Sequence, residues 1–161
     1  MLDKKSLFNF VYAIALVGAV MSCIGILNEF LNISQLYKIT ITSMITMKGE
    51  SYFVPFFFYL VAFIISAFAV TLVIFRLLGN SKLNKANVNA VLFVACIILL
   101  LMSFVFILFL RKYSKFYYLP YSKYLFYYTF RTGVMSFVAN MGVILVCNLV
   151  DEKNKKVQQA E

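Results

Sequence analysis

The chain contains no histidine and no tryptophan among its 161 residues. The absence of histidine excludes His-based catalytic triads, zinc sites that need a histidine ligand, and haem held by histidine. No glycine-rich loop of the kind that cradles phosphates is present either. We therefore expect a protein that is not an enzyme and has no cofactor, no catalytic residues and no metal site.

Acidic residues are scarce, and none lies in the middle of an apolar segment. The six acids are Asp3, Glu29, Glu50, Asp151, Glu152 and Glu161. An acidic residue or a histidine deep in a membrane is the usual mark of a proton relay or of an ion-coupled substrate site. Coupled transport through this chain alone is therefore disfavoured.

The three cysteines, Cys23, Cys96 and Cys147, are dispersed along the chain and form no C-x-x-C motif. This spacing gives little support to a redox or metal cluster, and it favours small side chains that pack between helices. Cys147 also lies close to the end of an apolar segment, so lipidation of its thiol is a second interpretation.

Apolar residues, by contrast, are abundant: 63% of the chain is hydrophobic, 13% is charged and the mean hydropathy is +0.90. They form four long runs, and a bilayer core about 30 Å thick is crossed by roughly 20 helical residues. The sequence predicts an all-α membrane protein, a single four-transmembrane-helix bundle with short loops over residues 1–161. The predicted spans are about 7–27, 53–78, 88–110 and 125–150.

The segments outside the spans are short. In the first outer loop, about 28–52, the stretch "YKITITSMITM" is rich in β-branched residues that alternate, which predicts a short β-strand over about 37–47. The same loop contains the sequon "NIS", so Asn32 is a candidate glycosylation site. Residues 151–161 are predicted to form a solvated, mobile cytoplasmic tail.

Four spans place both termini on one side of the membrane. The basic residues divide eight to seven between the two sides, so their total hardly discriminates. The first span is clearer, because Lys4 and Lys5 precede it and Glu29 follows it. The apolar run also continues beyond Cys23, which favours a span over a cleaved signal. We predict a multi-pass protein of the plasma or cytoplasmic membrane with cytoplasmic termini.

Small residues recur along one face of three spans, and such residues let membrane helices approach closely. The predicted helix-packing residues are Ala15, Gly18, Ser22 and Gly25 in the first span, Ala62, Ser66 and Ala69 in the second, and Gly133, Ser136 and Asn140 in the fourth. The third span has few, so we expect it to be the most exposed to lipid. Asn140 is either an interhelical hydrogen-bonding group or a pore or ligand contact. Arg76 and Arg131 lie at span ends, where long side chains reach the headgroups.

The segment "RKYSKFYYLPYSKYLFYYTFR", residues 111–131, holds ten aromatic and five basic side chains and no acid. Aromatic belts and basic groups are typical of the membrane edge, which is the favoured interpretation. A surface for a partner protein is the alternative, whereas nucleic-acid binding is not expected. The residues concerned are Arg111, Lys112, Lys115, Tyr117, Tyr118, Tyr121 and Lys123.

The layout of four spans, inner termini and a strand-forming first outer loop resembles that of claudin-type and MARVEL-type proteins. The chain lacks the Trp-Gly-Leu-Trp stretch and the cysteine pair of a claudin loop, so it is assigned to no family. We expect a non-enzymatic tetraspan protein that organises, anchors or assists a membrane complex. Its partners would be membrane lipids and other membrane protein subunits or further copies of itself. The alternative is a small homo-oligomeric channel or transporter, with a path lined by Ser66, Thr71, Ser136 and Asn140.

Overall fold

The computed structural model describes residues 4–36, 53–79, 84–114 and 122–158. Within these ranges the regular structure is helical throughout, in four helices: α1 (Lys4–Leu36), α3 (Phe53–Leu77), α4 (Lys85–Ser114) and α5 (Ser122–Gln158). The prediction of four helices is confirmed. The strand predicted for about 37–47 lies outside the described residues.

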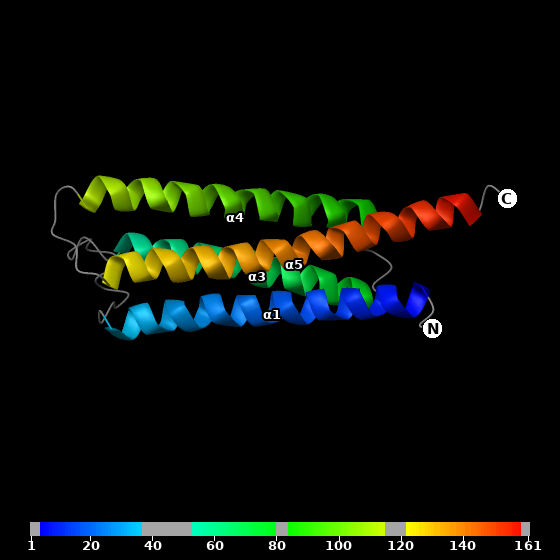
Figure 1. Ribbon diagram of the computed structural model, residues 1–161, viewed down its shortest axis with the longest axis horizontal. Coiled ribbons are helices and arrows are strands. Elements are labelled where there is room, and N and C mark those ends of the chain that lie inside the picture. Colours follow the sequence, from blue (N-terminus) through cyan, green and yellow to red (C-terminus); the bar gives the residue numbers. More distant parts are fainter. Residues whose placement is uncertain (1–3, 37–52, 80–83, 115–121, 159–161) are drawn as a thin grey trace.

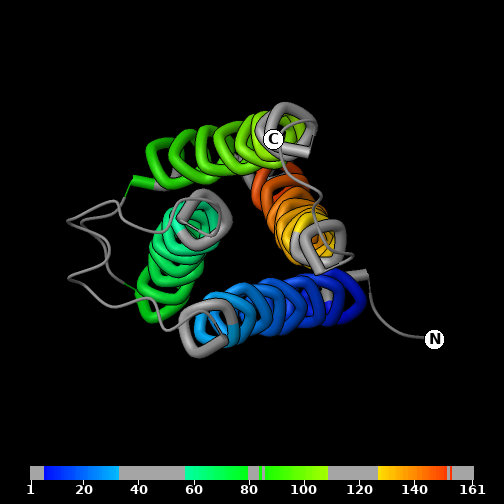
Figure 2. The backbone as a smooth tube through the Cα atoms, turned by 90° about the vertical axis from the view of Figure 1, so that its left-hand side faces the viewer, coloured from blue at the N-terminus to red at the C-terminus, as the bar shows by residue number. Residues whose placement is uncertain are grey.

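The helices lie side by side along one axis, with the start of α1 and the end of α5 at the same end of the bundle (Figure 1). Seen from the end, they occupy the corners of a square (Figure 2). α1 contacts α3 and α5, and α4 contacts the same two helices, so α1 and α4 face each other across a diagonal. Short connections between antiparallel neighbours give this order.

Each helix buries one seam of residues that recur at intervals of three or four, as helices of a bundle do when they pack side by side. The seams are Ala15, Ala19, Cys23 and Ile26 in α1; Tyr59, Ala62, Ser66, Ala69 and Val73 in α3; Val88, Leu92, Ala95, Leu99, Ser103 and Phe106 in α4; and Phe130, Val134, Phe137, Met141 and Ile144 in α5. The seams of α1 and α3 are rich in small residues, whereas those of α4 and α5 supply the large side chains that fill the centre.

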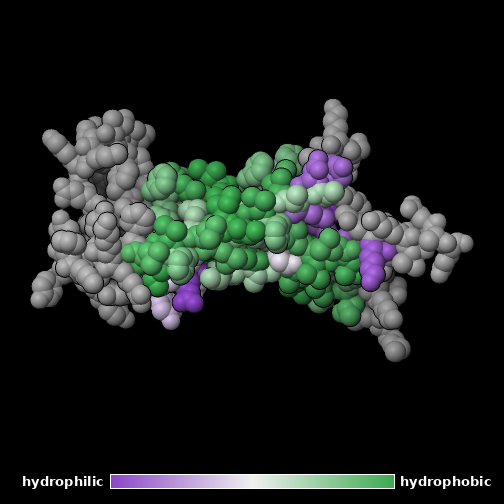
Figure 3. Space-filling model, turned by 90° about the horizontal axis from the view of Figure 1, so that it is seen from above, coloured by the Kyte–Doolittle hydropathy of each residue, from purple (hydrophilic) through white to green (hydrophobic). Residues whose placement is uncertain are grey.

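All four helices are long and apolar enough to cross a membrane, over Ser6–Asn32, Phe57–Leu77, Ala86–Leu108 and Tyr127–Asp151. Their outward surface is apolar between more polar ends (Figure 3). The chain therefore has the architecture of a multi-pass membrane bundle. The expectation that the third span is the most exposed to lipid stays a prediction: 33% of its most apolar window is buried, as in α3 and α5, against 28% in α1, whereas α4 makes the least extensive contact with its neighbouring helices. The α4 seam packs through large residues such as Leu92, Leu99 and Phe106, whereas the α1 seam packs through small ones such as Ala15 and Ala19.

Two helices extend beyond their predicted spans. α1 continues to Leu36, so Asn32 lies on the helix, exposed, and not in a loop. α5 continues to Gln158, so most of the predicted mobile tail is helical. No proline or glycine interrupts residues 151–158, and a helix that is already formed adds one backbone hydrogen bond per residue as it lengthens.

The turn between α3 and α4 uses the residue types expected at helix ends. Gly79 has a positive φ of 81°, a conformation that glycine adopts without steric cost, and its N–H donates to the carbonyl of Arg76. Asn84 precedes α4, and its side-chain oxygen accepts a hydrogen bond from the N–H of Ala86 at 3.1 Å. These two caps mark the end of α3 and the start of α4, near the cavity described below.

Candidate functional site

The closest approach between α1 and α5 occurs at the predicted packing residues. The Ser22 and Ser136 hydroxyls are hydrogen-bonded at 2.9 Å, and Ser22 also donates to the carbonyl of Gly18 at 2.8 Å. A Cβ added to Gly18 would lie 2.5 Å from Oδ1 of Asn140. Gly133 faces Ile26, whose Cγ1 would lie 3.2 Å from an added Cβ. Ala15 is buried on the same helix as Gly18.

Asn140 hydrogen-bonds within its own helix, because its amide nitrogen donates to the carbonyl of Ser136 at 2.8 Å. In this position the amide of Asn140 occupies the space that a side chain at position 18 would need. A structural role at this helix contact therefore accounts for Asn140, although the bond is not the interhelical one expected from the sequence.

The predicted α3 residues Ala62, Ser66 and Ala69 are buried inside the bundle. The Ser66 hydroxyl contacts Sγ of Cys23 at 3.5 Å and donates to the carbonyl of Phe63 at 3.0 Å. Gly25 is different, since an added Cβ would meet nothing within 4 Å. Its inclusion among the packing residues is wrong, because at this level of α1 the neighbouring Ile26 takes the buried position and Gly25 is exposed.

The four polar residues proposed to line a channel do not share a surface. Ser66 is fully buried, whereas Thr71 is exposed on the outside of α3 and donates to the carbonyl of Ala67 at 2.7 Å. Ser136 is on α5, which lies diagonally across the bundle from α3 (Figure 2). A path between copies could not include Ser66 without opening the core.

The end of the bundle opposite the termini is closed by aromatic side chains. Phe58 of α3 stacks on Phe106 of α4 with ring centroids 4.9 Å apart, and Phe130 of α5 meets Phe106 edge-on at 5.0 Å. Tyr59 packs edge-on against Phe130, and its hydroxyl is hydrogen-bonded to Thr129 at 2.6 Å. Aromatic contacts of this kind add to the area that they bury. These ring contacts hold α3, α4 and α5 together near this end of the bundle.

The end that carries both termini has a polar interior. Asn89 of α4 accepts two hydrogen bonds on Oδ1, from Nη1 of Arg76 at 3.3 Å and from Nδ2 of Asn148 at 2.9 Å. Asn148 is only 5% exposed. The Asn89 amide directs the guanidinium of Arg76 toward α4. The expectation that Arg76 also reaches the headgroups stays a prediction. Arg131, at the other end, is exposed.

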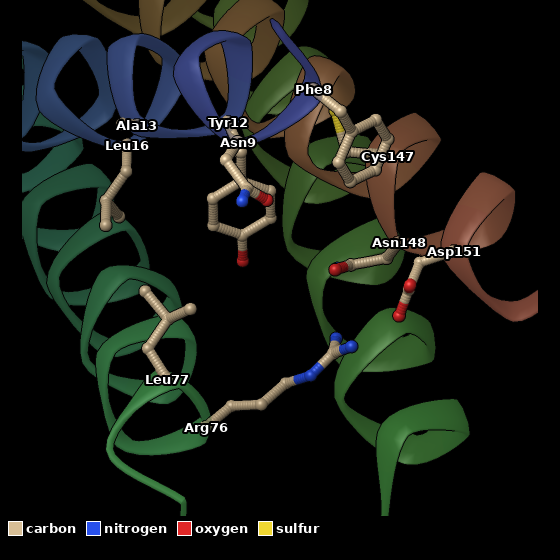
Figure 4. Close-up of a pocket in the computed structure, with 10 residues that line it drawn as sticks. All are labelled: Phe8, Asn9, Tyr12, Ala13, Leu16, Arg76, Leu77, Cys147, Asn148 and Asp151. Carbon is tan, nitrogen blue, oxygen red and sulfur yellow. The ribbon is translucent and has the colours of Figure 1, made fainter. Parts of the chain in front are cut away.

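A cavity of about 540 Å³ opens beside this polar cluster, between α1, α3 and α5. Figure 4 shows the hydroxyl of Tyr12, the guanidinium of Arg76, the amide of Asn148 and the carboxylate of Asp151 directed toward one space. The complete lining is Phe8, Asn9, Tyr12, Ala13, Leu16, Arg76, Leu77, Cys147, Asn148 and Asp151. The cavity therefore combines apolar walls with donors, an acceptor and both signs of charge.

The chemistry of this cavity is that of binding. Arg76 supplies a planar guanidinium, which recognises phosphate and carboxylate groups through paired N–H donors. Asp151 supplies a carboxylate for a cation or a hydroxyl. Across the described ranges, no three His, Cys, Asp or Glu side chains come together as a metal site would require. This cavity is the candidate functional site.

Several predicted residues cannot be placed in a site. Lys115, Tyr117, Tyr118 and Tyr121 lie outside the described residues. Arg111 and Lys112 belong to the last turn of α4 and Lys123 to the first turn of α5, at the end opposite the cavity. The interpretation of this segment as a membrane edge or a partner surface remains a prediction.

Sequence reasoning missed the residues of the cavity. Asn89 and Asn148 were absent from the predicted site, and Arg76 was explained by its place at a span end. One signal was available: Asn9, Arg76, Asn89 and Asn148 each lie near the span end that faces the termini. In a four-span bundle those ends must meet at one level of the membrane. Which helix faces turn inward, however, follows only from the packing.

The chain matches no protein-family model, no curated protein and no solved structure.

Proposed function

We propose that this chain is a non-enzymatic accessory subunit that organises, anchors or assists a larger membrane complex. The observation that carries the proposal is the apolar interior in the middle of the bundle. At that level the buried side chains are apolar or are small hydroxyls hydrogen-bonded to neighbouring groups, as Ser66 is. Among the described residues that are buried at that level none is charged, so a single copy offers ions no buried charge to pass along.

The lateral surface supports the same proposal. Large apolar side chains are exposed along all four helices, as lipid or another membrane protein would require. Membrane helices associate through close packing and hydrogen bonds. Ser136 of α5 is exposed beside Ser22 of α1, so a neighbouring helix could reach this pair of hydroxyls.

Purification of the full chain under mild detergent, followed by mass spectrometry of everything that remains bound, tests the proposal. A different membrane protein recovered in a fixed ratio supports the accessory role. Recovery of copies of the chain alone supports the homo-oligomeric channel, and recovery of a lone monomer contradicts both.

Single alanine variants at Tyr117, Tyr118 and Tyr121 then locate the contact. Loss of the partner from at least one variant, with membrane insertion unchanged, identifies a partner surface in that loop. Tyr128→Ala is the matched control, because Tyr128 is a tyrosine near the same end that is 67% exposed on α5. If all three variants keep every partner, the loop is a membrane edge, and the lateral surface becomes the place to search.

A further inference from the structure

We propose that the cavity between α1, α3 and α5 binds a zwitterionic phospholipid headgroup, one that carries a phosphate and a primary ammonium. Arg76 would hold the phosphate and Asp151 the ammonium. This binding site does not depend on the accessory role, because it follows from the cavity alone.

The size and position of the cavity suit such a ligand. Its volume of about 540 Å³ lies within the range of roughly 300 to 1,000 Å³ that small-molecule sites occupy. Arg76 and Asp151 stand at the last residues of their spans, and Asn9 near the start of another. The cavity thus lies at the depth where headgroups meet acyl chains, in the leaflet on the side of the termini.

The lining of the cavity includes both apolar and polar side chains, as a ligand with an acyl chain and a polar headgroup would require. Phe8, Leu16 and Leu77 supply apolar walls. Leu16 and Leu77 lie across the cavity from Asn148 and Asp151, whereas Phe8 lies beside Cys147 on the same side as these polar groups (Figure 4). An acyl chain gains by leaving polar surroundings for such walls. A water-soluble phosphate would gain nothing from these three side chains, so the lining favours the lipid form of the same headgroup.

The charged groups of the cavity, Arg76 and Asp151, match those of the headgroup in sign. The guanidinium has five N–H donors, of which one is directed to Asn89, and Arg76 also lines the cavity. The Tyr12 hydroxyl points into the same space and can donate to a phosphate oxygen. The carboxylate of Asp151 would repel a purely anionic headgroup but attract an ammonium. The paired charges therefore favour phosphoethanolamine over phosphoglycerol.

Thermal unfolding of the purified full chain in non-ionic detergent, titrated with defined lipids, tests the proposal. Phosphatidylethanolamine should raise the midpoint of unfolding in a saturable way, because a ligand that binds only the folded state stabilises it. Phosphatidylglycerol and phosphatidylcholine should give smaller shifts. Glycerophosphoethanolamine, the water-soluble headgroup, should act only at much higher concentration. An equal effect of both ethanolamine compounds would overturn the lipid as the source of the group.

Arg76→Gln removes the charge but keeps an N–H donor for Asn89, so the fold should persist. The titration should need about tenfold more phosphatidylethanolamine, as expected when a charge-assisted hydrogen bond is lost. Asp151→Asn should abolish the preference for phosphatidylethanolamine over phosphatidylglycerol. Arg131→Gln, at the opposite end, is the control that should leave the titration unchanged.

A steric variant gives an independent reading. Ala13 lines the cavity and is exposed, so Ala13→Leu fills the space without disturbing the core. It should weaken the lipid effect as strongly as Arg76→Gln does, whereas Ala139→Leu, exposed on α5 away from the cavity, should not. The proposal is overturned if Arg76→Gln and Ala13→Leu both respond to phosphatidylethanolamine as the native chain does. It is also overturned if phosphatidylglycerol stabilises the native chain as much as phosphatidylethanolamine does.

Discussion

Asn140 of α5 lies directly against Gly18 of α1, so closely that a Cβ at position 18 would stand 2.5 Å from its Oδ1. The amide is held there by its hydrogen bond to the carbonyl of Ser136. The two helices therefore approach over a glycine on one side and a fixed amide on the other. Close contacts between small residues and such polar groups stabilise membrane helix pairs in the absence of a hydrophobic drive.

Gly18→Leu should destabilise the bundle, because the new side chain must displace Asn140 and break its bond. Overpacking of this kind costs about 1–3 kcal/mol. Gly25→Leu is the matched control on the same helix, and it should be nearly silent because nothing lies within 4 Å of its added Cβ. Thermal unfolding in detergent measures both. Equal losses would mean that α1 does not meet α5 through Gly18.

The same contact predicts a rescue. Gly18→Ala alone should lower stability, and Asn140→Ala should recover most of that loss when the two are combined, since the clash disappears with the amide. A double-mutant cycle gives the coupling free energy directly. Strict additivity of the two changes would rule out contact between these positions.

Asn89→Ala should destabilise the polar end of the bundle. It removes the acceptor shared by Arg76 and Asn148, and it leaves the buried amide of Asn148 without that partner. A buried polar group left unsatisfied costs about 1–3 kcal/mol. Asn87→Ala, exposed on the same turn of α4, is the control and should cost much less. Equal losses of stability for Asn89→Ala and Asn87→Ala, measured by chemical or thermal unfolding, would refute the role assigned to Asn89.

Tyr59→Phe should lower stability modestly while preserving the aromatic packing, because it deletes only the hydroxyl bonded to Thr129 at 2.6 Å. Hydrogen bonds between membrane helices are worth about 0.6 to 2 kcal/mol. Tyr128→Phe, which alters an exposed ring, should change the unfolding midpoint less. A Tyr59→Phe variant as stable as the native chain would show that the hydroxyl adds nothing to packing.

The orientation of the chain can be tested at two exposed positions on opposite ends of the bundle. With cytoplasmic termini, a membrane-impermeant thiol reagent should label Asn32→Cys in intact cells and leave Asn84→Cys unlabelled. Cys23, Cys96 and Cys147 are all buried, which keeps the background low. Labelling of Asn84→Cys alone would invert the topology.

The sequence by itself determined the class of the protein. The chain has four runs of about 20 apolar residues, which is the length of a helix that spans a bilayer. Inside the bilayer no water can bond the backbone N–H and C=O groups, so a helix must pair them within each run. The spacing of Gly18, Ser22, Ser136 and Asn140 also indicated which faces of α1 and α5 carry small residues. Length and periodicity are local properties, so a single chain suffices to read them.

Tertiary structure alone decided which of these residues meet. Gly25 continues the small-residue pattern but faces outward, because the neighbouring Ile26 takes the buried position at this level of α1. Arg76 resembles any basic residue at a span end until Asn89, on the next helix, supplies an acceptor between the helices. The cavity likewise depends on three helices that are far apart in sequence. Its side chains converge because of how the seams of the bundle pack, and that relationship is not encoded in any one segment.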